Sequence, residues 1–194
     1  MVWCCWGKVI NSGQSFQKAY SNEETSRLVS TKAIAAQMND VQKSFVEALK
    51  PAVVSVSKKT GIVPSIILAQ AILESAWGTS KLAKEANNLF GIKVGQNWQG
   101  ETFEVETREF RNGTSVTEKA SFRSYKSVAD SVTDYGNFFT STPWRTKNYQ
   151  EFRTATNYVD AANALQKSGY ATDPQYSEKI KSVIERYALN KLDS

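Results

Sequence analysis

The chain has 194 residues, a formal net charge of +5 and a sequence pI near 9.1. It contains no histidine, which excludes Ser-His-Asp and Cys-His nucleophile systems and histidine-ligated zinc. Its two cysteines, Cys4 and Cys5, are adjacent, so they cannot close a useful loop or form a four-ligand metal site. Acid–base chemistry would therefore fall to carboxylates, lysines or tyrosines, and carboxylates fit best.

The positive charge is spread along the chain and forms no run of roughly five to eight Lys and Arg residues, so we expect no nucleic-acid partner. A diffuse basic surface suits any polyanion, including a bacterial wall rich in phosphate and carboxylate. No apolar run approaches the roughly 20 residues that span a bilayer, so we expect no membrane insertion. The stretch from Met1 to Lys8 lacks the basic start and the small-residue cleavage site of a signal peptide.

Residues 1–40 are polar, and we interpret them as an N-terminal extension or linker that is partly helical from Glu23 to Met38. Residues 41–194 form the predicted folded domain.

Clear helical periodicity begins at Asp40, which is the expected N-cap of the first helix of this domain. Pro51 predicts a break, after which a second helix is expected over residues 52–60 and ends at Gly61.

Pro64 opens a strongly apolar stretch, residues 65–77, which is followed by Gly78. Proline at the first helical position and glycine after the last are typical helix boundaries. Because this helix is apolar nearly all round, we expect it to be central and buried.

The character of the sequence changes over residues 98–125. Within them, residues 102–110 and 115–122 alternate apolar and polar side chains on either side of Asn112-Gly113, the strongest short-range signal of a β-hairpin. Turns are expected at 141–143 and 173–174. Helices are expected around these turns, over residues 128–140, 149–167 and 175–189. This order predicts an α+β fold, a mostly helical domain with a small β-hairpin lobe.

Glu74 is the only acidic residue between Pro51 and Lys84, and it falls in the last turn of the apolar helix. Burial and the negative end of the helix dipole both disfavour its charged form, so both should raise its pKa. A carboxylic acid that stays protonated near neutral pH is what protonation of a glycosidic oxygen requires. Trp77, three residues on, could supply an apolar wall or a sugar platform. The alternative is that Glu74 lies on a narrow solvent-facing strip beside Gln70.

A two-residue turn at Asn112-Gly113 would pair Glu109 with Val116 and Phe103 with Phe122. This register places Glu109 on an otherwise apolar face of the hairpin. A carboxylate is unfavourable on an apolar face that packs against the core, so its presence indicates a function such as lining a cleft. The alternative is that Glu109 ends its strand and curls into solvent.

Two tyrosines border the turn before the last predicted helix, where Asp173 reads as the cap and Pro174 as the first helical residue. That cap does not explain Tyr170 or Tyr176. Tyrosines beside a cleft stack on sugars and donate hydrogen bonds, and the alternative for each is a half-buried packing role.

Spaced motifs in this chain resemble those of glycoside hydrolase family 73, the bacterial and phage N-acetylglucosaminidases that include autolysins and the flagellar peptidoglycan hydrolase domain. The motifs are residues 69–80 (AQAILESAWGTS), residues 87–93 (NNLFGIK), the hairpin stretches 107–110, 112–113 and 120–125, and residues 170–174 (YATDP). The similarity covers about Val41 to Leu189, and residues 1–40 lie outside it.

The resemblance implies a lysozyme-like fold and an endo-β-N-acetylglucosaminidase that cleaves the β-1,4 bond between N-acetylglucosamine and N-acetylmuramic acid in peptidoglycan. The catalytic acid of the family falls on Glu74, its second carboxylate on Glu109 and its functional tyrosine on Tyr170. Further substrate-binding positions are expected at Trp77, Asn88, Phe90, Tyr125 and Asp173. The resemblance implies no metal and no cofactor.

Two roles remain open for Glu109. If Glu74 acts alone, the N-acetyl group of the substrate attacks the anomeric carbon, and Tyr170 helps to position it. If Glu109 activates water, inversion is expected, with the carboxylates about 6.5–9.5 Å apart or more.

The expected partner is the peptidoglycan glycan strand, and the expected oligomeric state is a monomer. The expected place of action is outside the cell at the cell wall, and a phage-encoded lysin or virion-associated hydrolase is an equally suitable source. One rival is a lytic transglycosylase, which would leave an anhydro-sugar product. A second rival is a non-catalytic wall-binding module in which Glu74 is idle. A helical nucleic-acid binder is suggested only by the pI.

Overall fold

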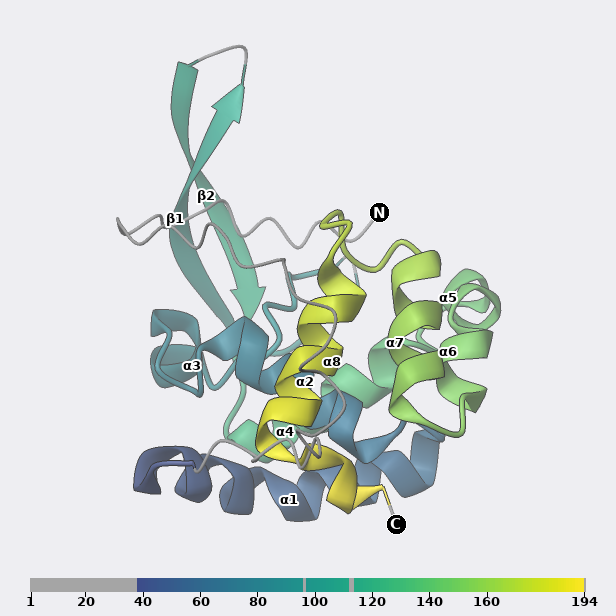
Figure 1. The fold of residues 1–194 in the computed structure, drawn as a ribbon. Coiled ribbons are helices and arrows are strands. Elements are labelled where there is room, and N and C mark those ends of the chain that lie inside the picture. The colour runs from purple at the N-terminus through teal and green to yellow at the C-terminus, as the bar shows by residue number, and fades with distance from the viewer. Residues whose placement is uncertain (1–37, 96, 112–113, 194) are drawn as a thin grey trace, which may run out of the picture.

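The computed structural model describes residues 38–95, 97–111 and 114–193, with the side chains of all of these except residues 107–118 (Figure 1). Residues 1–37 of the extension predicted over residues 1–40, and with them all of its predicted helix except the last residue, Met38, lie outside the described residues. The predicted hairpin turn, Asn112-Gly113, lies outside them as well.

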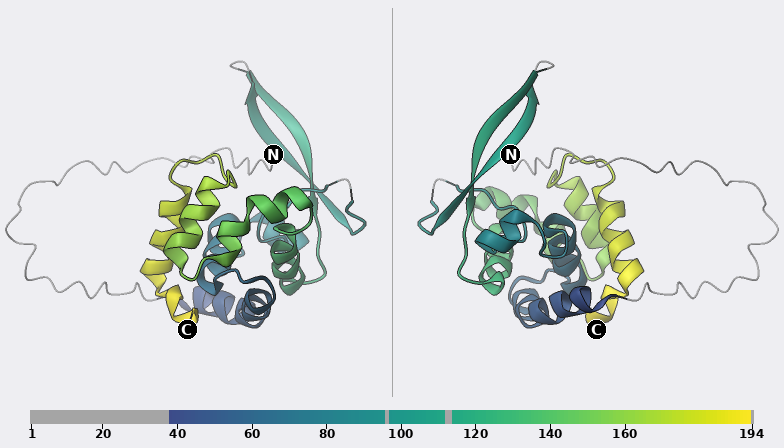
Figure 2. Two further views of the ribbon diagram at one scale, coloured as in Figure 1. Left: turned by 90° about the vertical axis from the view of Figure 1, so that its right-hand side faces the viewer. Right: turned by 90° about the vertical axis from the view of Figure 1, so that its left-hand side faces the viewer.

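The described helices form one body from which a two-stranded hairpin projects (Figures 1 and 2). In chain order the elements are α1 (Asp40–Thr60), α2 (Pro64–Ser75), α3 (Lys81–Ala86), β1 (Thr102–Arg111), β2 (Thr114–Arg123), α4 (Val128–Phe138), α5 (Pro143–Asn148), α6 (Gln150–Thr154), α7 (Tyr158–Lys167), α8 (Tyr176–Tyr187) and the 3-10 helix η1 (Leu189–Leu192).

The apolar helix α2 lies inside the helical body, packed against α1, α7, α8 and η1. It is buried on nearly every side, as the sequence predicts. It ends at Ser75 and not beside Gly78 as predicted, because Ala76 and Trp77 already take left-handed backbone conformations. Glu74 therefore lies in the last turn of α2.

Helix α1 runs without a break through Pro51, so the predicted break is wrong. Proline removes one backbone donor and crowds the carbonyl four residues before it, which here belongs to Glu47. Both residues are exposed, so water can solvate that carbonyl while the apolar face of α1 stays packed. The helix ends before Gly61 as predicted, but its cap is Asn39, whose side chain accepts a main-chain hydrogen bond of 2.9 Å, and not Asp40.

The C-terminal helices are shorter than predicted. The single helix expected over residues 149–167 is divided between α6 and α7, because Asn157 caps a new helix start. Helix α8 starts at Tyr176, so Asp173 is not its N-cap. The Asp173 carboxylate instead accepts the backbone N–H of Gln175 at 2.9 Å, in the turn before the helix.

Strands β1 and β2 pair antiparallel in the predicted register, with Phe103 opposite Phe122 and Glu109 opposite Val116. An isolated bridge from Lys93 to the second strand adds a further contact at the base of the hairpin.

A charged contact holds the base of the hairpin against α4. Arg123 Nη1 lies 2.7 Å from Oδ2 of Asp134, and the hydroxyl of Tyr125 donates to the same oxygen at 2.7 Å. The two charged side chains are only 17% and 20% exposed, so water screens their attraction weakly. The guanidinium carbon of Arg123 also lies 4.6 Å from the centre of the Trp98 ring. Together these contacts fix where the hairpin leaves the helical body.

Helices α1 and α4 can approach closely because Gly136 has no side chain. A Cβ at this position would lie 2.5 Å from Cγ1 of Val56 and 3.3 Å from Cγ2 of Thr60, both on α1. These distances are shorter than ordinary contact, so a larger residue would force the helices or the two side chains to shift.

We expect Gly136→Ala to lower the free energy of unfolding by about 1–3 kcal/mol, the usual cost of overpacking a core. A gain in helix propensity of up to about 1 kcal/mol offsets only part of this cost. Urea unfolding measures the change. Val56→Ala is the matched comparison, because it removes the methyl group that the new Cβ would crowd. Its loss of unfolding free energy should be smaller in the Gly136→Ala background than in the wild type. Strictly additive costs would contradict the close contact.

Candidate active site

Glu74 is half-buried, and its Oε1 accepts a hydrogen bond of 2.7 Å from the hydroxyl of Tyr176 on α8. Burial raises the pKa of Glu74, and the Tyr176 hydrogen bond, a smaller effect, lowers it. The upward direction is the one expected from the sequence. The solvent-facing strip beside Gln70 is not present, because Gln70 is fully buried.

Gln70 connects Tyr176 to a second buried tyrosine. Its Nε2 donates to the Tyr176 hydroxyl at 3.0 Å, and its Oε1 accepts a hydrogen bond from the hydroxyl of Tyr135 on α4. Burial holds the pKa of Tyr135 well above its usual value. The sequence alone does not assign Gln70 or Tyr135 to the site. The sequence feature that could have pointed to Gln70 is its place in the apolar helix: it is a polar residue four positions before Glu74, so the two lie on the same face.

Tyr170 lies behind Tyr176. It is 4% exposed, and its ring stacks on those of Tyr176 and Phe139, each at 5.9 Å between centroids. The tyrosine that hydrogen-bonds to Glu74 is therefore Tyr176, while Tyr170 supports it from the aromatic core.

Asn88 and Phe90 are both 1% exposed. The Asn88 amide donates to the carbonyls of Ile92 (3.0 Å) and Arg123 (2.8 Å), and its oxygen accepts the N–H of Ile92 at 3.1 Å. Phe90 stacks on Tyr135, with 4.2 Å between ring centroids. These two residues join the loop after α3 to the hairpin base and to the tyrosine behind Gln70.

Trp77 is half-buried between Phe45 of α1 and Tyr187 of α8, with ring centroids 6.0 Å and 4.9 Å away. Its ring thus packs edge-on against two helices.

Tyr125 and Asp173 each interact with another side chain of the protein, Tyr125 with Asp134 and Asp173 with Lys179. Tyr125 is 7% exposed, and burial and the Asp134 carboxylate both raise its pKa. Asp173 forms an ion pair with Lys179, and this contact together with the hydrogen bond from Gln175 lowers the pKa of Asp173.

Glu109 lies in β1 opposite Val116, as predicted, on the part of the hairpin away from the helical body. Its side chain lies outside the described residues.

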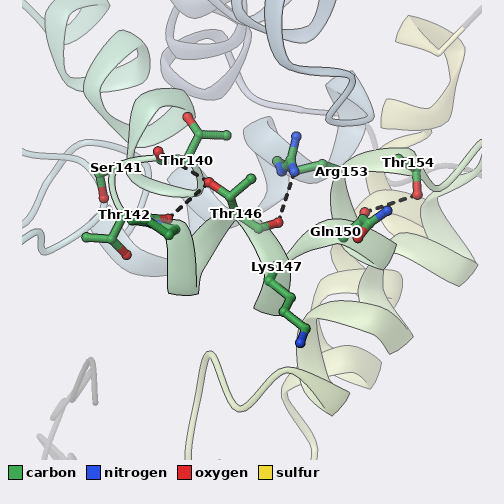
Figure 3. Close-up of a pocket in the computed structure, with 9 residues that line it drawn as sticks. Thr140, Ser141, Thr142, Thr146, Lys147, Gln150, Arg153 and Thr154 are labelled. Carbon is green, nitrogen blue, oxygen red and sulfur yellow. Dashed lines mark hydrogen bonds between the residues drawn. The ribbon is translucent and has the colours of Figure 1, made fainter.

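A separate cavity of about 700 Å³ lies beside α5 and α6 (Figure 3). Its hydroxyl groups bond back to the main chain: Thr146 to the carbonyls of Thr140 (3.4 Å) and Thr142 (3.0 Å), and Thr154 to that of Gln150 (3.0 Å). The residues that line it are Thr140, Ser141, Thr142, Pro143, Thr146, Lys147, Gln150, Arg153 and Thr154. None of the candidate site residues is among them.

Within the described ranges, no three His, Cys, Asp or Glu side chains gather in the manner of metal ligands. No helix in the same part of the chain is long and apolar enough to cross a membrane.

Residues 50–189 match the family model Glucosaminidase, described as mannosyl-glycoprotein endo-beta-N-acetylglucosaminidase. The chain belongs to the glucosaminidase family. It is 43% identical over 155 residues to the exo-glucosaminidase LytG of Bacillus subtilis, covering 79% of this chain and 54% of the relative. It is 36% identical over 175 residues to the peptidoglycan hydrolase FlgJ of Escherichia coli K12, covering 86% and 54%. The chain thus spans about half the length of these curated relatives.

Solved structures of glucosaminidase relatives share the fold. The catalytic domain of the autolysin Auto from Listeria monocytogenes aligns with a TM-score of 0.71 at 31% identity, covering 82% of this chain and 92% of that one. A C-terminally truncated glycoside hydrolase domain of FlgJ from Salmonella typhimurium aligns at 0.64 and 35% identity, covering 76% and 97%. The predictions of family, of a glycoside hydrolase domain and of a lysozyme-like α+β fold are confirmed.

We expect Asn88→Ala to act on stability and not on substrate affinity. The substitution leaves the N–H of Ile92 without its side-chain acceptor and removes one donor from the carbonyls of Ile92 and Arg123. These losses should lower the free energy of unfolding by about 1–3 kcal/mol. KM for the glycan should stay at the wild-type value at temperatures where the variant is folded. Thermal unfolding and steady-state kinetics on one preparation measure both. A raised KM with unchanged stability would instead place Asn88 against the substrate.

Proposed function

We propose that this domain is an endo-β-N-acetylglucosaminidase that hydrolyses the β-1,4 bond between N-acetylglucosamine and N-acetylmuramic acid in peptidoglycan. The observation that carries the proposal is the Glu74 carboxyl group, whose pKa is raised by burial in α2 and which keeps a hydrogen-bond donor, Tyr176, at one oxygen. The similarity of this chain to LytG, an exo-glucosaminidase, and to FlgJ, a peptidoglycan hydrolase, supports the substrate class.

In the proposed reaction, Glu74 begins protonated and gives its proton to the glycosidic oxygen as the bond to the anomeric carbon breaks. The carboxylate that forms is stabilised by the Tyr176 hydrogen bond, which strengthens as negative charge develops. Water completes the reaction. Either Glu109 activates that water directly, or the N-acetyl group of the substrate first attacks the anomeric carbon, with Tyr170 helping to position it.

The other predicted binding residues enter this proposal in two ways. Trp77 follows the end of α2, which carries Glu74, and Asp173 precedes the start of α8, which begins with Tyr176. We propose that both side chains lie next to the bound glycan. Asn88, Phe90 and Tyr125 act one step further away, because they hold the hairpin base and Tyr135 in place.

The proposed place of action is the cell wall, reached from outside the cell or as part of a phage lysin or virion, with the domain acting as a monomer on peptidoglycan strands. Product analysis separates the neighbouring functions. New reducing-end N-acetylglucosamine supports hydrolysis as proposed, while anhydromuramic ends would identify a lytic transglycosylase. A rapid fall in strand length supports internal cleavage, whereas steady release of single sugars would identify an exo-enzyme, as the name of LytG describes.

Glu74→Gln should reduce kcat on purified peptidoglycan by about 10²–10⁴-fold, the usual contribution of a general acid. The amide keeps the shape of the side chain, so sedimentation with cell walls should be unchanged. Glu85→Gln, which alters an exposed acid on α3, is the matched control and should retain wild-type turnover. Wild-type lysis by Glu74→Gln would refute the acid assignment and favour a wall-binding module.

The two roles of Glu109 predict linked results for Glu109→Gln. If Glu109 is the base, the variant should lose about 10²-fold or more in kcat, and the wild-type product should have inverted anomeric configuration. If the substrate acetamide is the nucleophile, kcat should stay close to wild type and the configuration should be retained. NMR of the first-formed anomer measures the stereochemistry. Glu104→Gln, on an exposed position of the same strand, is the control. Inversion without loss of activity would contradict both roles.

A further inference from the structure

A continuous chain of hydrogen bonds crosses the core and ends at Glu74. It begins at Tyr135 on α4, passes through Gln70 on α2 and Tyr176 on α8, and reaches Oε1 of Glu74. Tyr135 and Gln70 are at most 1% exposed, so water does not compete for these bonds. Three helices that are distant in sequence thus meet in one polar line inside an apolar core.

We propose that Gln70 is a positioning residue for Glu74: held by Tyr135, its amide group directs the Tyr176 hydroxyl to act as donor to Glu74 and not as acceptor from it. The inference deepens the proposed function and rests on it, because it concerns how the general acid of that reaction is controlled.

The direction follows from the donors and acceptors of each group. Burial keeps the Tyr135 hydroxyl protonated, and it uses this proton to bond the oxygen of Gln70. The amide oxygen is thereby occupied, and the NH₂ group of Gln70 faces Tyr176. The Tyr176 oxygen accepts from that NH₂ group, so the single hydroxyl hydrogen of Tyr176 is directed to Oε1 of Glu74.

This direction has two consequences for Glu74. Since Oε1 receives a hydrogen from Tyr176, the acidic proton of Glu74 belongs on Oε2, which makes Oε2 the oxygen that protonates the leaving group. The donor also favours the carboxylate over the acid, which opposes the effect of burial. The relay therefore keeps the pKa of Glu74 from rising so far that proton transfer to the glycosidic oxygen becomes unfavourable.

Two tyrosines of the relay also influence the ionisation of Glu74. Tyr176 from α8 and Tyr135 from α4 are both coupled to Glu74, the first through its hydrogen bond and the second through the charge of the carboxylate.

The test measures the ionisation of Glu74 without relying on activity. Protein labelled with ¹³C-glutamate is titrated by NMR, with the Glu74 carboxyl signal assigned by its loss in Glu74→Gln. Tyr176→Phe should raise the midpoint by about one pH unit, since it removes a hydrogen bond to a charged group. Gln70→Met and Tyr135→Phe should shift it in the same direction, because each frees the Tyr176 hydroxyl to accept a hydrogen from protonated Glu74. The basic limb of kcat/KM on peptidoglycan should move upward with each midpoint.

Tyr158→Phe is the matched control, because it removes another tyrosine-to-glutamate hydrogen bond, from Tyr158 to Glu185 at 3.3 Å, on the opposite side of α8 from the relay. Its Glu74 midpoint and pH profile should equal those of the wild type. Wild-type midpoints in folded Gln70→Met and Tyr135→Phe, with a shifted Tyr176→Phe, would overturn the proposal. If Gln70→Met does not fold, Tyr135→Phe alone decides. Shifted midpoints in a protein that does not cleave peptidoglycan would leave the relay standing and refute the proposed function.

Discussion

The burial of α2 is the constraint on which the rest of the site depends. An apolar helix inside the helical body stabilises the domain by removing its side chains from water, but this helix also carries Gln70 and Glu74. Polar groups in such a position are costly unless they are hydrogen-bonded. Tyr135 and Tyr176, from α4 and α8, form hydrogen bonds with them. The packing of these helices therefore also sets the surroundings of Glu74, the proposed general acid.

A second polar centre connects this core to the hairpin. The Arg123–Asp134 pair and the Tyr125 hydroxyl fix β2 to α4, the helix that also carries Tyr135. Asn88 ties the loop after α3 to the same end of β2. The hairpin is therefore anchored at its base, and the two strands are paired along its outer part, where Glu109 lies near the far end. A carboxylate carried at the far end of such a two-stranded lobe fits either of the roles proposed for Glu109.

Much of the fold, and the placing of Glu74 in a buried helix, follow from the sequence. The apolar stretch with a single acid predicted α2 and Glu74, and the alternation around Asn112-Gly113 predicted the strand register. The errors also have local causes. A proline in an exposed helix position did not break α1, because packing of the opposite face outweighs one lost hydrogen bond.

The sequence by itself determined the local patterns: which stretch is buried, which strands pair, and which acid stands in apolar surroundings. Each of these patterns depends on the spacing of residues that are a few positions apart, and the sequence shows that spacing directly. Only the tertiary structure decided that Gln70 is buried and that Tyr176 is the tyrosine bonded to Glu74. The partners in that relay are 65, 106 and 102 residues apart, and no local periodicity relates them. They meet because α8 packs against α2, while α4 packs against α1 and reaches Gln70 through Tyr135. Burial then requires each polar group to find a hydrogen-bond partner.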